Sequence, residues 1–181
     1  MSLSLGSPAP EFSLPGVDGA THSLEGYAYA KVLVLVQFCN HCPYVLAWED
    51  RLAGITTDYA GRGVRILAVN SNDVDAYPED SFERMQERAA KKRFPFAYAY
   101  DGTQELAHAL GAERTPEVFV FDQERILRYH GAIDDSREQR SVRTQFLRDA
   151  LGALLVSKDP PVKETEPVGC SVKYRDGSLT A

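Results

Sequence analysis

Two cysteines three positions apart, Cys39 and Cys42, are the residues of this chain best suited to covalent chemistry. They lie in the sequence CNHCP, directly after the apolar run 32–36 and before an amphipathic stretch. Two thiols at this spacing can close a small disulfide ring, and a Cys-x-x-Cys pair between a strand and a helix indicates a redox dithiol. Backbone N–H groups at a helix start stabilise a thiolate, the nucleophile of disulfide exchange. The pattern therefore predicts redox chemistry, with inert buried thiols and a structural metal site as the alternatives.

His41 and Cys170 also bear on this chemistry. His41 can donate to a Cys39 thiolate, which would favour the reduced form and make the disulfide more oxidising; an exposed residue without a role is the alternative. Cys170 follows in a polar C-terminal stretch. The sequence leaves open whether it is a third redox thiol, a metal ligand beside the dithiol, or an unpaired cysteine. A zinc site of one histidine and three cysteines is conceivable, but His41 adjoins Cys42, which is awkward for tetrahedral ligation, and we predict no metal.

The dithiol needs a sheet and a helix to position it. Apolar runs predict strands, and helical spacing of apolar residues predicts helices between them. The expected strands are 32–38, 64–69, 97–100, 117–121 and 126–130, after an irregular lead-in with a hairpin near 17–19. Four helices are expected. The first starts after Pro43, and the second covers 81–93 with Asp80 or Ser81 as its cap. The third covers 104–110, and the last is marked by apolar residues from Val142 to Leu154. This order predicts an α/β fold with a mixed sheet, whose reactive groups gather at the carboxyl ends of its parallel strands.

Length and charge bound the function. The chain has 181 residues, of which 44% are hydrophobic and 25% charged, and a formal net charge of −6. We expect one domain over 1–156 and a C-terminal tail over 157–181 that packs on the domain or trails from it. An acidic chain without a basic cluster is a poor ligand for nucleic acid or anionic membranes. No apolar run approaches the ~20 residues of a membrane span, and the start does not look like a signal peptide, so a cytoplasmic location is expected.

The chain resembles thioredoxin-fold proteins of the redoxin branch, the AhpC/TSA-type group that includes peroxiredoxins and small thiol-disulfide oxidoreductases. CNHCP stands at the place of the family's dithiol, and AERTP at 112–116, followed by VFVFD, resembles its cis-proline loop and next strand. The strings CNHCPYV, NSNDV, AYPEDS, IDDSR and GCSVKY resemble a subgroup labelled thioredoxin family protein. The resemblance covers about residues 5–175 and implies a thioredoxin-like fold with a central mixed β-sheet flanked by helices.

The resemblance implies roles for residues around the dithiol. Cys39, as the exposed cysteine at the helix start, would attack a substrate disulfide, and Cys42 would resolve the mixed disulfide from inside. Pro116 would be a cis proline, and the backbone of Thr115 would pair with an incoming peptide. The residues that tune the redox potential would be Asn40, His41 and Pro43.

Departures from the family pattern affect the reaction. Leu33 stands where thioredoxins carry a buried aspartate, and Phe38 where they carry tryptophan; Gln37 or Glu117 are the alternatives for proton handling, or simple strand-end polar residues. Peroxiredoxins carry Pro-x-x-x-Thr/Ser-x-x-Cys, which fits neither cysteine: counting back gives Val36 and Val32 from Cys39, and Cys39 and Leu35 from Cys42.

The sequence thus predicts a thiol-disulfide oxidoreductase that acts on a disulfide-bearing protein or small thiol, with a reductase partner and without a bound cofactor. A thiol peroxidase with antioxidant activity and a metal-binding protein using the same cysteines are the alternatives. The polar segments 70–73 and 134–137 either rim the site or form turns and caps. The other histidines, His22, His108 and His130, are expected to be isolated surface or strand residues.

Overall fold

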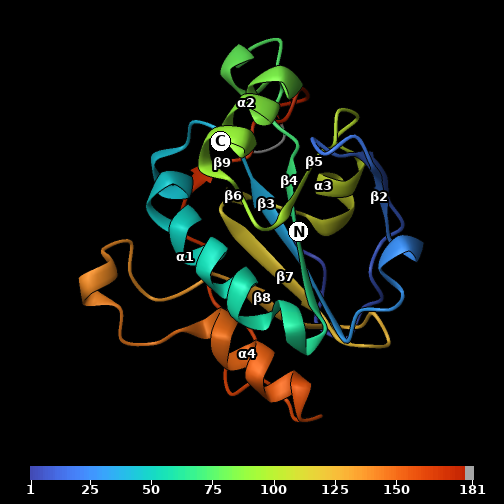
Figure 1. The fold of residues 1–181 in the computed structure, drawn as a ribbon, viewed down its shortest axis with the longest axis vertical. Helices are drawn as coiled ribbons and strands as arrows, with labels where there is room; N and C mark the ends of the chain where they lie inside the picture. The colour runs from blue at the N-terminus through green and yellow to red at the C-terminus, as the bar shows by residue number, and fades with distance from the viewer. Residues whose placement is uncertain (178–181) are drawn as a thin grey trace.

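A five-stranded mixed sheet forms the centre of the computed structural model, which describes residues 1–177 (Figure 1). The strand order is β5-β4-β3-β7-β8, with β4 and β5 parallel to β3, and with β7 antiparallel to both of its neighbours. The strands are β3 (Val32–Phe38), β4 (Val64–Asn70), β5 (Ala97–Tyr100), β7 (Glu117–Phe121) and β8 (Leu127–Gly131). The predicted thioredoxin-like α/β architecture is confirmed.

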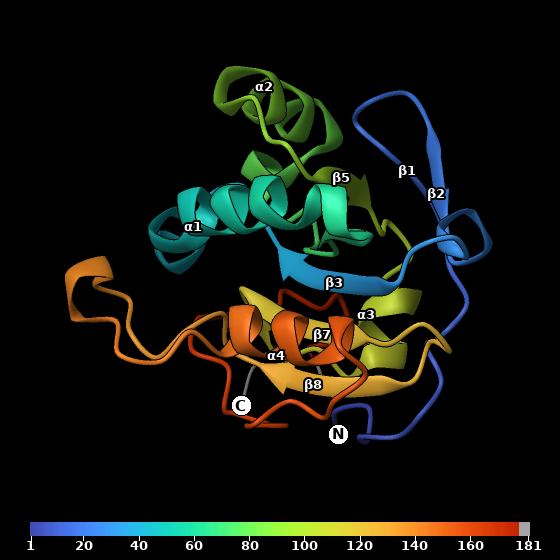
Figure 2. The same ribbon diagram turned by 60° about the horizontal axis from the view of Figure 1, so that its bottom comes forward.

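Helices cover both faces of this sheet. They are α1 (Pro43–Tyr59), α2 (Phe82–Lys92), α3 (Glu105–Leu110) and α4 (Phe146–Leu155). Short 3-10 turns add η1 (Glu25–Tyr27), η2 (Ala60–Arg62), η3 (Pro78–Asp80) and η4 (Gln139–Ser141). The predicted hairpin is present as β1 (Ser13–Pro15) and β2 (Thr21–Ser23). The hairpin lies beyond β5, and its Gly16 forms an antiparallel bridge with Ala99 of that strand (Figure 2).

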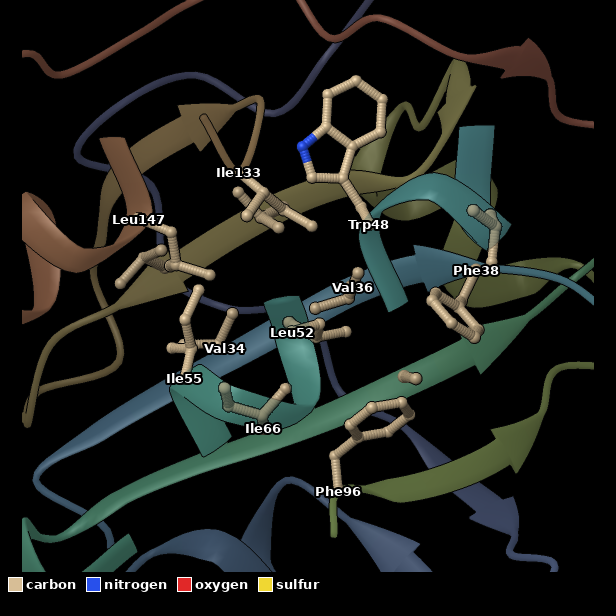
Figure 3. Packing of buried hydrophobic residues seen from close by; sticks show 14 of the residues in the cluster. Val34, Val36, Phe38, Trp48, Leu52, Ile55, Ile66, Phe96, Ile133 and Leu147 are labelled. Atoms are coloured by element: carbon tan, nitrogen blue, oxygen red, sulfur yellow. The ribbon is translucent and has the colours of Figure 1, made fainter. Parts of the chain in front are cut away.

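Two hydrophobic clusters hold the layers together. On one face, α1 and α4 pack on alternate residues of β3, and Figure 3 shows Trp48, Leu52 and Ile55 of α1 beside Val34 and Val36. On the other face, the remaining residues of β3 pack against α3 and the N-terminal segment. Because β3 is central and covered on both sides, all seven of its residues are buried. The strand end that carries the dithiol is therefore fixed by the core.

The segment after α4 returns to the domain. Its strand β9 (Cys170–Ser171) pairs antiparallel with β6 (Arg114–Thr115), a two-residue strand just before β7. Val172 and Tyr174 are buried in the second cluster, and the Tyr174 hydroxyl donates to the carbonyl of Ala112 at 2.8 Å. The segment 157–177 thus packs on the domain; residues 178–181 of the expected tail lie outside the described residues.

The last helix begins later than its apolar spacing predicts. Val142 is extended, and α4 starts at Phe146. The Asp135 carboxylate accepts the backbone N–H groups of Arg143 and Thr144, which holds this stretch as a loop. Helix α2 begins after Ser81, whose hydroxyl accepts the backbone N–H of Arg84 as an N-cap. Among the described helices, none combines the length and the apolar character needed to cross a bilayer.

Candidate active site

The two cysteines lie at the junction of β3 and α1. Cys39 directly follows β3, and Cys42 is the N-cap residue of α1 with Pro43 at its first position. Proline suits that position because its fixed φ fits the helix and its missing N–H would have no helical partner. Both thiols are buried, with Cys39 0% and Cys42 2% exposed. The expectation that Cys39 is the exposed sulfur is wrong, because the loop at 115 and the C-terminal segment cover this junction.

The loop that contains Pro116 lies against both sulfurs. The peptide bond between Thr115 and Pro116 is cis, the isomer that the resemblance implies. The Cys39 thiol donates to the Thr115 hydroxyl oxygen at 3.7 Å, and the Cys42 thiol donates to the Thr115 carbonyl oxygen at 3.4 Å. Thr115 itself is fully buried. Thr115, which lies 76 positions after Cys39 and 73 after Cys42, thus forms one site with the dithiol.

Cys170 joins the same site through β9. Cys170 is the residue opposite Thr115 in the β6–β9 pairing, and it lines the same pocket as Cys42. A pocket of about 100 Å³ connects the three sulfurs. It is lined by Cys39, His41, Cys42, Pro43, Asn72, Thr115, Cys170, Ser171 and Lys173. Cys170 is a free thiol, as are Cys39 and Cys42, and it lies against the domain rather than trailing from it (Figure 1 shows β9 beside β6).

The three thiols have different acidities. A hydrogen bond from Cys39 lowers the pKa of Cys42 to about 4, helped by Cys170 and the backbone N–H of Val45 at the helix start, against burial, which raises it. The same bond to Cys42 raises the pKa of Cys39, and burial and the negative charge of Asp80 raise it further. Burial raises the pKa of Cys170 to about 11. These directions favour a thiolate at Cys42 over one at Cys39.

Asp80 is a buried carboxylate behind the dithiol that the sequence did not connect with it. It is fully buried in η3 and accepts the backbone N–H of Asn40 and the side-chain amide of Asn72, each at 2.8 Å. The side chain of Asn70 donates to its carbonyl oxygen at 2.7 Å. The polar segment 70–73 thus anchors Asp80, and Asn72 also lines the pocket. An aspartate before a helix reads as a cap, so no local signal links it to a cysteine 41 positions away.

His41 is half-buried beside this carboxylate. Its Nδ1 lies 2.9 Å from an Asp80 oxygen but is not aligned for a hydrogen bond, so the contact is an ion pair when the imidazole is protonated. The ring stacks on Tyr77 with centroids 6.1 Å apart. Ligand-type atoms of Cys39, His41 and Asp80 lie within 4.8 Å of one another. Since both Asp80 oxygens already accept amide N–H groups, and the group includes a single thiol, hydrogen bonding accounts for this cluster.

Glu117 supports the loop from the opposite face. One of its oxygens accepts the backbone N–H groups of Glu113 and Arg114, at 2.7 and 2.8 Å, and the other contacts Nε2 of His130 at 2.5 Å. Burial lowers the pKa of His130, but the hydrogen bond and charge of Glu117 outweigh it and raise the pKa overall. His130 is therefore part of a buried pair, which corrects its expected isolation. Gln37, the other alternative for proton handling, makes no side-chain hydrogen bond among the described residues.

The segment 134–137 serves the scaffold. Asp134 accepts Nε1 of Trp48 at 2.8 Å and pairs with Arg51 at 2.7 Å. Neither contact reaches the thiol pocket, so this segment fits the turn-and-cap alternative. Trp48 itself is a core residue.

A dithiol between a parallel strand and a helix, beside a cis proline, on a mixed sheet covered by helices defines a redox protein of thioredoxin-like fold. Comparison with known families agrees: the sequence pattern of the AhpC/TSA family matches residues 5–130. The chain belongs to the AhpC/TSA family.

The comparisons also find relatives over most of the chain. An uncharacterized conserved protein from Geobacillus kaustophilus is 39% identical with a TM-score of 0.90, covering 95% of this chain and 93% of that one. A hypothetical protein from Sinorhizobium meliloti is 35% identical with a TM-score of 0.91, covering 98% of each. The thiol-disulfide oxidoreductase ResA of Geobacillus thermodenitrificans is 27% identical over 67% of this chain. The match spans 66% of that curated relative's length.

Proposed function

We propose that this protein is a thiol-disulfide oxidoreductase that exchanges a Cys39–Cys42 dithiol with the disulfide of a substrate. The observation that carries this proposal is the pair of adjacent buried thiols that both contact Thr115 of the cis-proline loop, and the opposite directions of their pKa shifts agree with it. A sulfur that is ionised at neutral pH beside a protonated one is what exchange requires, since a thiolate attacks and a thiol then resolves. Family membership supports the same chemistry.

The pKa asymmetry favours Cys42 as the attacking sulfur, the reverse of the roles that the resemblance implies. The Cys42 thiolate attacks one sulfur of the substrate disulfide, forms a mixed disulfide, and releases a thiolate that takes up a proton. The Cys39 thiol then loses its proton and attacks the Cys42 sulfur, which releases the second substrate thiol. Two electrons leave the dithiol, and the Cys39–Cys42 disulfide forms. The same steps run backwards when the protein acts as an oxidant.

Neighbouring residues would assist these steps. Asp80 keeps Cys39 protonated until it attacks, because its negative charge disfavours a second thiolate. Asn40 fixes the loop between the cysteines by donating to the Glu79 carbonyl and accepting from Tyr98. Pro116 and Thr115 hold the surface that contacts the sulfurs. Pro43 starts the helix, and His41 lines the pocket wall beside Asp80.

Electrons pass through sulfur, so the exchange itself needs no bound cofactor. The proposed substrates are a disulfide-bearing protein or a small thiol in its disulfide form, and a reductase partner would return the dithiol to its reduced state. The cytoplasmic location stays a prediction from the sequence, and fractionation of the native host would test it.

Trapping of mixed disulfides tests the proposal. With oxidised glutathione as substrate and mass spectrometry of every cysteine, wild-type protein is expected to form a Cys39–Cys42 disulfide. In a Cys170→Ser background, Cys39→Ser should accumulate a mixed disulfide on Cys42, while Cys42→Ser should react at least about tenfold more slowly, because its remaining thiol at 39 is protonated at neutral pH. Absence of any Cys39–Cys42 disulfide in the wild type would overturn the function. A mixed disulfide that builds up on Cys39 in Cys42→Ser at the wild-type rate would reverse the roles.

Peroxide reduction is a second candidate, favoured by the small size of the pocket at the sulfurs, about 100 Å³. In this reaction the Cys42 thiolate attacks a peroxide oxygen, which gives a sulfenic acid and an alcohol or water. A second thiol condenses with the sulfenic acid and releases water, leaving a disulfide. Consumption of hydrogen peroxide with dithiothreitol as donor measures this activity. Turnover that persists unchanged in Cys42→Ser, or no turnover above the rate of free dithiothreitol, would exclude it.

A further inference from the structure

The C-terminal segment occupies the strand edge next to the dithiol. Thr115 lies within 4 Å of both active-site sulfurs, and its strand β6 has β9 as its partner. A strand edge pairs with any extended chain of suitable shape, which is how many proteins capture peptides. At this edge the pairing residue opposite Thr115 is Cys170. The chain thus places one of its own cysteines where a bound peptide would place one.

The placement of Cys170 is built into the fold by contacts on both sides of β9. The backbone N–H of Val172 donates to the Glu113 carbonyl at 3.0 Å. The backbone N–H of Lys173 donates to Asn72 Oδ1 at 2.9 Å, and the carbonyl of Lys173 accepts the backbone N–H of Asp73 at 2.8 Å. The side chain of Val172 is 1% exposed. These contacts lie far from one another in sequence, so they fix the segment against the domain rather than against itself.

Gly169 allows the close approach. A Cβ at this position would lie 2.1 Å from the Thr115 carbonyl oxygen and 2.7 Å from its carbon. Both are backbone atoms of the loop that touches the sulfurs, so they cannot move aside as a flexible side chain would. Any other residue at 169 would push Cys170 away from Cys42.

We propose that Cys170 is a third redox thiol, that Cys42 exchanges its disulfide bond between Cys39 and Cys170, and that β9 closes the strand edge to peptide substrates. The proposal rests on the function proposed above and names the substrate class: small disulfides that enter the pocket. Larger protein disulfides gain access when the segment around β9 leaves the edge.

The exchange is balanced without an external oxidant. The Cys170 thiol loses its proton and attacks the Cys42 sulfur of the Cys39–Cys42 disulfide. The bond between Cys42 and Cys170 forms, the bond between Cys39 and Cys42 breaks, and Cys39 leaves and takes up a proton. The number of disulfides and electrons is unchanged. Cys42 and Cys170 line one small pocket, and Cys170 pairs opposite Thr115, whose carbonyl oxygen lies 3.4 Å from the Cys42 sulfur, so the two reacting sulfurs meet at one site.

Mapping of disulfides in Cys39→Ser tests the third thiol. After reaction with oxidised glutathione, the variant is expected to lose the glutathione from Cys42 and to hold a Cys42–Cys170 disulfide in more than half of its molecules. A stable glutathione adduct on Cys42 with a free Cys170 would overturn the inference while leaving the proposed function intact. If the wild type forms no Cys39–Cys42 disulfide in parallel, the proposed function itself fails.

A second variant tests the closed edge without removing a sulfur. Gly169→Ala should displace β9, and the rate of exchange with a disulfide-linked peptide should rise about tenfold over wild type. The yield of the Cys42–Cys170 disulfide in the Cys39→Ser background should fall. Gly152→Ala is the matched control, since a Cβ there meets no atom within 4 Å, and wild-type behaviour is expected. Equal peptide exchange rates for the wild type and both glycine variants would overturn the closure.

Discussion

Replacing Asp80 by asparagine should lower the pKa of Cys39 and so make its thiol easier to ionise. The variant keeps the shape of the side chain but removes a fully buried negative charge whose oxygen lies within 4.8 Å of the Cys39 sulfur. That charge raises the pKa of Cys39. At 4.8 Å and an effective dielectric constant of about 20, the repulsion between a carboxylate and a thiolate is about 3.5 kcal/mol. The backbone N–H of Asn40, which donates to Asp80, offsets part of this repulsion.

A single-thiol background makes this effect measurable. With Cys42→Ser and Cys170→Ser in place, Cys39 is the remaining thiol, and alkylation by iodoacetamide from pH 6 to 10 reports its ionisation. Asp80→Asn is expected to raise the alkylation rate at pH 7 by about 10- to 100-fold, since a tenfold change corresponds to about 1.4 kcal/mol. The position of the pH profile, rather than its height, separates ionisation from changed access to the buried sulfur.

Glu79→Gln is the matched control. It removes the same charge from the neighbouring residue, which is half exposed and 3.8 Å from His41. Water screens that charge, so the alkylation rate should stay within about twofold. Asp80→Asn also places an amide N–H where Asp80 accepts the side-chain amide of Asn72, so one hydrogen bond is lost. We expect this loss to lower the unfolding free energy by about 1–3 kcal/mol, which urea denaturation would measure. A pH profile that Asp80→Asn leaves in place, with the fold intact, would refute the electrostatic argument.

Three further predictions follow from the site and its scaffold. Because the pKa of Cys42 is about 4, its alkylation rate in the reduced wild type should stay level from pH 8 to 5 and fall towards pH 4. Alkylation followed by mass spectrometry of each cysteine measures this rate, and a fall centred above pH 7 would contradict the low pKa. The raised pKa of His130 means that its pairing with Glu117 stabilises the protein fully below the ordinary value of 6.5 and is lost as pH rises through the folded-state pKa. Glu117→Gln should therefore flatten the fall of unfolding free energy in that range, which has a slope of at most about 1.4 kcal/mol per pH unit; an unchanged slope in urea titrations would argue against the pair. Leu52→Ala in the buried face of α1 should cost about 2–5 kcal/mol and Leu46→Ala, 44% exposed, under about 0.5 kcal/mol; equal losses in chemical denaturation would contradict the packing.

The sheet and its main helices could be predicted because their signals are local. The run 32–38 is apolar except for Gln37, as expected of a strand covered on both faces, and the structure places β3 at those residues. Pro43 marks the start of α1, and helical spacing from Val45 to Ile55 marks its buried face. The predicted start of the last helix at Val142 is wrong, because apolar spacing does not reveal the Asp135 carboxylate, which accepts the backbone N–H groups of residues 143 and 144 and holds them in a loop before α4.

The sequence by itself determined the strand, the helix start and the spacing of Cys39 and Cys42, since these follow from neighbours along the chain. Tertiary structure alone decided the directions in which the pKa values of the two sulfurs shift, because these depend on burial, on Asp80 and on the N–H of Val45. It also decided the place of Cys170. Strands β6 and β9 have two residues each and no periodicity to recognise, and they meet only because the folded domain brings residues 55 positions apart into register.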